Sequence, residues 1–220
     1  MSYAIHPIRL AMPLRLGTVN AYLVRSEAGW ALIDSGAPNA RAALLRALEA
    51  AGCRADELRL IALTHGDFDH TGCAAFLRAR SGAPIAMHPA DAAMLERGDM
   101  FAGRAQRNPL MGWLAPRLFG FGRAQRAAPD HLLAEGDDLT PLGLPARVLH
   151  LPGHSRGSIG LLTPGGDLFC GDLLANTDGP KLNDLLDDAD AARASVERLR
   201  ELGAARVYPG HGEPFELGDL

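Results

Sequence analysis

The sequence predicts an α/β fold of four layers, an αββα sandwich in which two β-sheets pack face to face and helices cover their outer surfaces. Short apolar runs alternate with helical patterns in both halves of the 220-residue chain. Each half follows the same order of strands, a helix and another strand, which favours helices outside two sheets. The 25 glycines and 15 prolines stand mostly at the ends of apolar runs, as in a fold of many short strands.

The composition is that of one soluble globular domain spanning residues 1–220, with 47% apolar and 22% charged residues. A net charge of −4 argues against nucleic-acid binding, so we expect a small-molecule substrate. No apolar run approaches the roughly 18 residues that span a bilayer, and the N-terminus lacks the pattern of a secretory signal. Three scattered cysteines favour free thiols in the cytoplasm. The oligomeric state stays open, with a homodimer as one alternative.

The first elements are a predicted hairpin and a helix. Residues 18–24 and 30–33 are rich in strand-forming side chains and are separated by a short polar turn. The second run ends in Asp34, which is either a turn former or a support for a metal ligand. The apolar spacing over residues 38–51 predicts an amphipathic helix that ends at Gly52.

The loop after the next strand is the most informative stretch. Residues 60–63 predict a buried strand, and a helix is expected over residues 71–80. The loop between them carries four metal-capable side chains: His65, Asp67, Asp69 and His70. Imidazole nitrogens and carboxylate oxygens suit a divalent first-row metal. The alternative is a polar turn in which Asp69 caps the helix.

A short strand is expected over residues 84–87, followed by a helix that His88 opens. His88 lies before a proline at a helix start, which favours a structural role. Residues 94–129 are irregular and contain six arginines but two acids. They predict a helical insertion, which either packs its own small core or forms a lid over an apolar and anionic substrate.

In the second half, strands are predicted over residues 146–150, 159–162, 167–170 and 205–208, with a helix over residues 189–202. Three of these strands lead into a glycine-flanked His or Asp: His154, Asp172 and His211. Glycine permits tight turns that bring such a side chain into a crowded centre. With the first loop, they make seven candidate ligands at strand ends.

The chain resembles the metallo-β-lactamase-fold hydrolase superfamily over essentially its whole length. The matching motifs, in order, are Asp34-Ser-Gly36, Thr64-His-Gly-Asp-Phe-Asp-His70, Pro152-Gly-His154-Ser, Gly171-Asp172 and Pro209-Gly-His211-Gly212. The resemblance implies the αββα fold, with two metals in a cleft at one edge of the sheets. It further implies that His65, Asp67 and His154 hold one metal, that Asp69, His70 and His211 hold the second, and that Asp172 bridges them.

The motif departs from the family pattern His-x-His-x-Asp-His at Asp67, which stands in the second His position. A carboxylate is still a good ligand there, so we expect two divalent ions. Zinc is the first expectation, and Fe or Mn are alternatives because Asp67 offers a harder oxygen. Asp34, Ser155 and Ser158 are expected to support the ligands from behind.

The resemblance implies a metal-dependent hydrolase that uses a metal-bridging hydroxide to cleave an ester, thioester, lactone or related bond. Asp69 is expected to orient the nucleophile and accept its proton, and Asp172 to take part in catalysis as the bridging ligand. Two alternatives within the fold are a di-iron redox protein related to the flavodiiron branch and a phosphodiesterase-type hydrolase. A scaffold protein with a dead site is the alternative outside catalysis.

Overall fold

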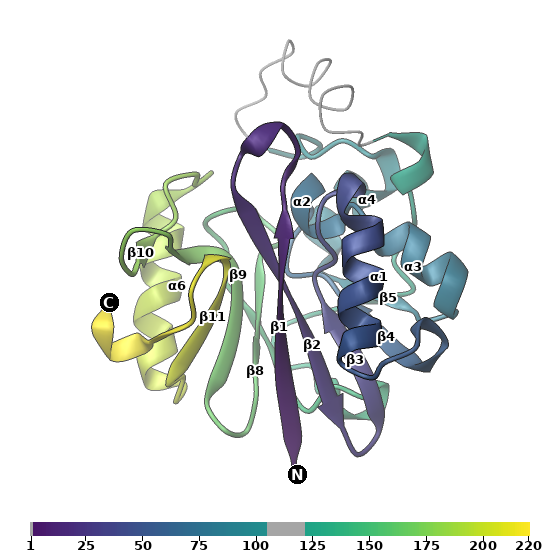
Figure 1. Cartoon of the computed structure of the whole chain (residues 1–220). Coiled ribbons are helices and arrows are strands. Elements are labelled where there is room, and N and C mark those ends of the chain that lie inside the picture. Colours follow the sequence, from purple (N-terminus) through teal and green to yellow (C-terminus); the bar gives the residue numbers. More distant parts are fainter. Residues whose placement is uncertain (1, 105–121) are drawn as a thin grey trace.

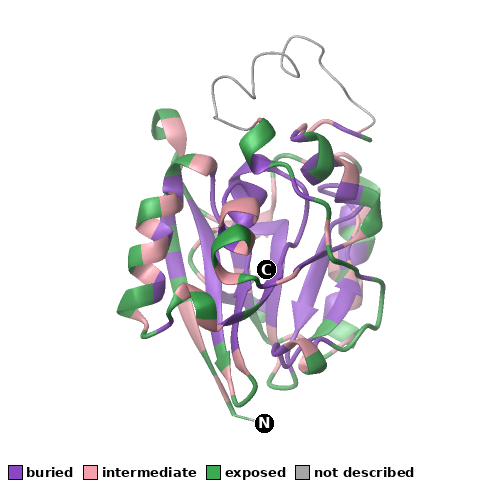
Figure 2. Ribbon diagram, turned by 90° about the vertical axis from the view of Figure 1, so that its right-hand side faces the viewer, coloured by how far each residue is buried: buried purple, intermediate pink, exposed green. Residues whose placement is uncertain are grey.

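A computed structural model describes residues 2–104 and 122–220 and confirms the αββα sandwich. In Figure 1 the helix α6 (Ala189–Glu201) covers one side of the molecule, α1 (Arg41–Ala50) and α3 (Ala74–Ser81) cover the other, and two sheets lie between them. Figure 2 shows that the central strands are mostly buried, whereas the helices expose their outer faces. Among the described residues, no helix is long and apolar enough to cross a membrane.

The first sheet runs in the order β1-β2-β3-β4-β5-β6. Its strands are β1 (Tyr3–Ala11), β2 (Thr18–Ser26), β3 (Gly29–Ile33), β4 (Leu58–Ala62), β5 (Ile85–Met87) and β6 (His131–Leu132). The β1-β2-β3 part is antiparallel, and β3 to β6 are parallel. The crossovers carry the helices α1, α2 (Phe68–Thr71), α3 and α4 (Pro89–Arg97).

The second sheet runs in the order β12-β11-β9-β8-β7, with β10 paired to β9. Its strands are β7 (Arg147–His150), β8 (Ile159–Leu162), β9 (Asp167–Asn176), β10 (Lys181–Leu182), β11 (Arg206–Gly212) and β12 (Phe215–Glu216). The helix α6 connects β10 to β11. Asp188 starts α6 by accepting hydrogen bonds from the backbone amides of Asp190 and Ala191.

Three layers of apolar side chains join the four layers of secondary structure. Alternation along β2 shows how they form: Leu23 points toward α1 and α3, whereas Tyr22 and Val24 point toward the second sheet. Phe169 of β9 meets Tyr22 between the sheets, with ring centroids 5.2 Å apart. Leu199 of α6 closes the third layer against the second sheet. Because both faces of the central strands are buried, their sequences are continuous apolar runs rather than alternating ones.

The structure differs from the sequence predictions in several elements, and the short strands β6, β10 and β12 are among those not predicted. The strand β1 was not predicted, because it is a half-exposed edge strand that contains Pro7, and edge strands tolerate proline. The helix expected over residues 71–80 is two helices, α2 and α3. The strands β9 and β11 continue past the expected ends, so Asp172 and His211 lie within strands rather than after them.

The extension of β9 and β11 has a geometric reason. Their parallel pairing shifts register around Pro209, where Pro209 pairs with Gly171. Gly171 has a φ of +52°, a left-handed conformation that favours glycine. The strands resume after this irregularity instead of ending there. Most of the insertion expected at 94–129 falls on residues 105–121, which lie outside the described part of the chain.

Candidate metal centre

The seven side chains singled out in the sequence come from four separate places and meet at one edge of the two sheets. His65, Asp67, Asp69 and His70 follow β4, and His154 lies between β7 and β8. Asp172 and His211 come from the neighbouring strands β9 and β11. The structure arranges six of them as two groups of potential ligands, each with its atoms within 4.8 Å of one another. The groups are His65, His154 and Asp172, and Asp69, His70 and His211.

The four histidines share one orientation, in which Nδ1 is held by an oxygen atom. His154 Nδ1 lies 2.6 Å from the carbonyl oxygen of Leu185, and His211 Nδ1 lies 2.8 Å from that of Thr18. A carbonyl oxygen only accepts, so Nδ1 donates in both rings. In neutral rings this leaves the Nε2 lone pairs available for a cation.

Asp34 fixes the other two histidines. Its Oδ2 atom lies 2.8 Å from His70 Nδ1 and accepts a hydrogen bond of 2.8 Å from Thr64 Oγ1. Because this hydroxyl proton goes to Asp34, Thr64 Oγ1 can accept from His65 Nδ1, which lies 3.0 Å away. The support that the sequence suggested for Asp34 is therefore present. Asp34 adopts a left-handed φ of +58°, as expected for a short polar residue at a tight turn.

Three of the ligand atoms that face the centre are left without hydrogen bonds. Among the described residues, His65 Nε2, His70 Nε2 and Asp172 Oδ1 are buried polar atoms with no hydrogen-bond partner. His70 Nε2 and Asp172 Oδ1 lie 3.2 Å apart, yet their orientation is not that of a hydrogen bond. Buried polar atoms are normally satisfied, so three such atoms aimed at one spot fit a bound cation. The donor set of imidazole and carboxylate also fits Zn, Fe or Mn.

Burial and the charges of neighbouring groups together shift the pKa values of side chains in the centre. Burial lowers the pKa of His65 well below its usual value. Burial also acts to lower the pKa of His211, but the nearby Asp172 and Asp69 raise it to about 10. For Asp172, burial acts to raise the pKa, whereas His211 and His70 hold it well below its usual value. The carboxylates therefore make a spot that favours positive charge.

Asp67 lies beside the first group and uses its two oxygens differently. Its Oδ2 atom lies 3.0 Å from His154 Nε2 and 3.8 Å from His65 Nε2. Its Oδ1 atom accepts a hydrogen bond of 2.5 Å from Arg104 Nη2. Asp67 is therefore next to the first group, although it is not among that group's mutually close ligands.

Asp91, which the sequence did not single out, joins the two ligand-bearing loops. Its carboxylate accepts hydrogen bonds from the amide of Gly66 at 3.0 Å, from Ser155 Oγ at 2.6 Å and from the amide of Gly157 at 2.9 Å. Gly66 follows His65, and Ser155 follows His154. A single buried aspartate at a helix start carries no distinctive local pattern, so only its position before Met94 and Leu95 could have suggested burial.

The other supporting predictions have mixed outcomes. Ser155 binds Asp91, and Ser158 binds Ser155, so neither serine supports a histidine as expected. His88 is structural, as predicted: it caps α4 by accepting from the Ala90 amide, and it stacks on His150 with ring centroids 4.3 Å apart. The three cysteines are buried and free, as expected.

Five of the seven side chains, Asp67, Asp69, His154, Asp172 and His211, line a pocket of about 550 Å³. Its apolar wall is formed by Met12, Leu16, Phe68, Met100, Phe101, Ala175 and Leu185. Lys181 lies on the rim, where its ammonium group pairs with Asp178 and Asp184. The pocket thus combines a charged floor with an apolar side, which suits a ligand that has one polar reacting group.

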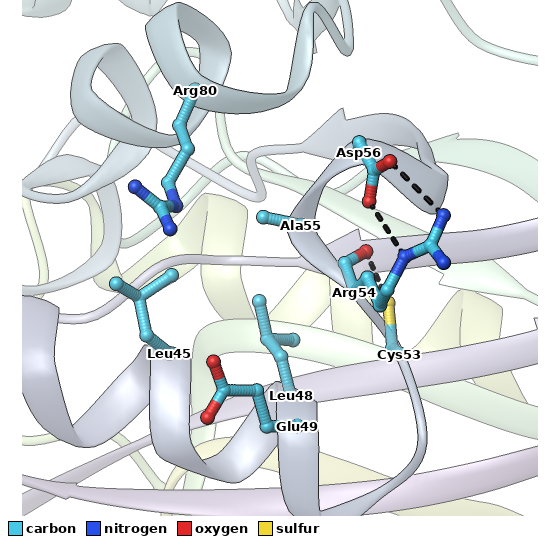
Figure 3. A pocket seen from close by; sticks show the side chains of 8 residues that line it. All are labelled: Leu45, Leu48, Glu49, Cys53, Arg54, Ala55, Asp56 and Arg80. Atoms are coloured by element: carbon cyan, nitrogen blue, oxygen red, sulfur yellow. Dashed lines mark hydrogen bonds and ion pairs between the residues drawn. The ribbon is translucent and has the colours of Figure 1, made fainter.

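Figure 3 shows a second hollow, of about 390 Å³. It is lined by Leu45, Leu48, Glu49, Cys53, Arg54, Ala55, Asp56 and Arg80. Arg54 is turned to Asp56, with which it makes two hydrogen bonds of 3.1 Å. Because none of the clustered histidines lines this hollow, it is not a candidate for the reaction site.

Comparison with known proteins identifies the family. The model of the metallo-beta-lactamase superfamily matches residues 14–211, which include all seven side chains. The chain belongs to this superfamily.

Two curated superfamily relatives are enzymes by name. Human acyl-coenzyme A thioesterase MBLAC2 is 33% identical over 89% of this chain and 74% of its own length. The hydroxyacylglutathione hydrolase of Acidiphilium cryptum (strain JF-5) is 34% identical over 90% of this chain and 81% of its own length.

A solved superfamily structure agrees with the fold and bears on the metal. The protein TTHA1623, crystallised in a di-iron-bound form, is 34% identical to this chain and superposes with a TM-score of 0.71. The match covers 94% of this chain and 95% of that one. The metallo-beta-lactamase fold expected from the motifs is thereby confirmed.

Proposed function

We propose that this protein is a metal-dependent hydrolase of small thioesters. The observation that carries the proposal is the convergence of four Nδ1-anchored imidazoles and the carboxylates of Asp69 and Asp172, several of which line one pocket. Both curated relatives described above are named for thioester cleavage, which favours this bond over an ester or a lactone. Three free cysteines are in keeping with a cytoplasmic enzyme.

We propose that two cations are bound, one by each group. His65, Asp67 and His154 would hold the first, and Asp69, His70 and His211 the second. Asp172 would bridge them, because its Oδ1 lies 3.2 Å from His70 Nε2 and its Oδ2 lies 3.3 Å from His211 Nε2. The same carboxylate belongs to the group of His65 and His154. Zinc remains the first expectation, and the di-iron relative supports iron as the alternative.

When bound, two such cations supply Lewis acidity, which makes a water nucleophilic near neutral pH and polarises a carbonyl. The residues supply orientation and proton transfer. Asp69 Oδ2 lies 3.4 Å from His211 Nε2, so the carboxylate borders the space where a water would be positioned. We propose that Asp69 orients this water and accepts its proton. The oxygen partners of the four Nδ1 atoms keep the imidazoles from rotating, so their positions are set before substrate arrives.

The substrate side of the proposal rests on the pocket wall. Met100 and Phe101 line it from the start of the 94–129 segment, and Leu16 lines it from the β1–β2 hairpin. These side chains suit an acyl group. We propose that residues 94–129 act as a lid over this pocket, although residues 105–121 lie outside the described part of the chain.

The test is metal analysis of the purified protein followed by a substrate panel. The panel contains an acyl-coenzyme A, a hydroxyacylglutathione, a simple ester, a lactone and a phosphodiester. We expect two metal ions per chain and the fastest turnover with a thioester, which a chelator abolishes and added metal restores. Thioester cleavage that survives full metal removal would refute the mechanism. A coloured di-iron protein that is inactive on the whole panel would instead favour the redox alternative.

A further inference from the structure

Arg104 brings a buried positive charge to the edge of the first ligand group. Its side chain is 11% exposed and lies between two carboxylates. The Nη2 atom donates to Asp67 Oδ1 at 2.5 Å, and Nη1 donates to Asp187 Oδ1 at 3.1 Å. The Nε atom donates to the carbonyl oxygen of Met100 at 3.1 Å. The guanidinium is therefore held by the protein's own acceptors, and Nη2 also lies 3.4 Å from His154 Nε2. Arg104 is not among the residues that line the substrate pocket.

As a result, the two oxygens of Asp67 have different partners. Oδ1 is occupied by Arg104, whereas Oδ2 faces His154 Nε2 at 3.0 Å and His65 Nε2 at 3.8 Å. With Oδ1 engaged, Asp67 can offer the first group one oxygen but not two. The guanidinium also offsets the charge of this carboxylate. Asp67 therefore offers one donor atom, as an imidazole does, and Arg104 offsets part of its charge.

The positions of the two carboxylates suit an arginine better than a lysine. Asp67 and Asp187 approach different nitrogens of the same planar group, and both acceptors belong to loops around the centre. The fork of a guanidinium can satisfy two such carboxylates at once, whereas a lysine ammonium is a single compact charge. Arg104 also lies 3.4 Å from the carbonyl oxygen of His154, which adds an acceptor from the ligand loop itself.

We infer that Arg104 is a positioning residue that keeps Asp67 a one-oxygen, charge-compensated ligand and thereby sets the metal preference of the first group. The inference rests on the metal centre of the proposed function. A carboxylate with one available oxygen beside two imidazoles suits Zn²⁺. The same carboxylate, freed on both oxygens and carrying its full charge, becomes a harder ligand that favours Mn²⁺.

The test is a double-mutant cycle read out by metal binding. Dissociation constants for Zn²⁺ and Mn²⁺ are measured by competition with a chromophoric chelator for the unmodified protein, Arg104→Gln, Asp67→His and the double variant. We expect Arg104→Gln to shift the Mn²⁺/Zn²⁺ preference toward Mn²⁺ by about tenfold. In the Asp67→His background the same change should leave the preference within about threefold, because an imidazole has no second oxygen to release. Arg104→Lys should keep most of the original preference, since it retains the charge.

Each outcome decides the inference. A preference that does not move in Arg104→Gln, or that moves equally in both backgrounds, overturns it. Thermal unfolding of each variant is followed by circular dichroism, and Arg104→Met, which also removes the charge, carries the comparison if Arg104→Gln does not fold. Thioester turnover is measured separately. Loss of turnover with the expected pattern of metal preferences would count against the proposed substrate and leave the role of Arg104 standing.

Discussion

Asp91 accepts a hydrogen bond of 2.6 Å from Ser155 Oγ, although the two residues stand 64 positions apart in the chain. Asp91 lies in the first turn of α4 beside the first sheet, and Ser155 lies on the β7–β8 loop of the second. The same carboxylate also accepts from the amides of Gly66 and Gly157. One buried side chain thus holds the loop of His65 against the loop of His154.

Asp91→Ala should destabilise the protein strongly. The change leaves the donors of Gly66, Ser155 and Gly157 without their acceptor, and each unsatisfied buried donor costs about 1–3 kcal/mol. We expect a loss of about 3 kcal/mol or more in the free energy of unfolding, measured by urea denaturation. Metal affinity of the first group should fall as well. Glu197→Gln on the exposed face of α6 is the control and should leave both quantities unchanged. Wild-type stability in Asp91→Ala would contradict this account.

Asp34→Asn should weaken metal binding at the second group. The amide nitrogen would face His70 Nδ1 and Thr64 Oγ1, which now both direct protons at Asp34. A metal-bound histidine that loses its carboxylate partner typically loses affinity by about 10–100-fold. The measurement is metal titration against a competing chelator. Asp56→Asn removes an exposed carboxylate far from the centre and serves as the comparison. Equal affinities for the two variants would show that Asp34 does not orient His70.

Gly210→Ala should disrupt the centre while leaving most of the core intact. A Cβ atom at this position would overlap the carboxylate of Asp172 and lie 2.6 Å from His70 Cε1. Both side chains would have to move, so we expect metal content and turnover to fall by tenfold or more, about the size that a displaced ligand produces. Gly218→Ala is a matched control, because a Cβ atom there meets nothing within 4 Å. Full metal occupancy in Gly210→Ala would be inconsistent with the observed packing.

Metal removal should lower the thermal stability of the protein. Asp67, Asp69 and Asp172 are buried around histidines whose Nε2 atoms lack partners, and a bound cation stabilises the folded state by mass action. We expect a chelator to lower the midpoint of thermal unfolding by several degrees and added metal to restore it. Asp172→Asn should make the midpoint insensitive to the chelator. An unchanged midpoint after verified metal removal would contradict the stabilisation expected from a bound cation.

The thiols of Cys73 and Cys170 should be unreactive at pH 8. Burial raises the pKa of each to about 12, above the ordinary value near 8.5. A raised pKa means that the folded state disfavours the thiolate, so alkylation by iodoacetamide at pH 8 should be slow until urea unfolds the chain. Because the pKa of each thiol is higher in the folded than in the unfolded state, the free energy of unfolding should fall as the pH rises above about 8.5. Mass spectrometry of the alkylated protein measures both thiols. Rapid labelling of the folded protein would contradict the burial.

The fold could be predicted from the sequence because its strands and helices have strong local patterns. The central strands are continuous apolar runs, and α6 repeats apolar residues at helical spacing, so β4, β8 and α6 were placed within a few residues. The strand β1 was missed because an edge strand with a proline has no such pattern. The ends of β9 and β11 were misplaced because pairing between them, across a register shift at Pro209, decides where they stop.

The sequence by itself determined the chemistry of the centre, since residue types and glycine-flanked motifs are local and can be read along the chain. Only the tertiary structure decided which atoms of those residues are available. The orientation of each imidazole depends on oxygens of Asp34, Thr64, Leu185 and Thr18, and three of these come from other parts of the chain than the histidines they hold. The engagement of Asp67 by Arg104 likewise depends on contacts between distant segments. Such hydrogen bonds form only after the layers have packed, because their donors and acceptors come within reach of one another only in the folded chain.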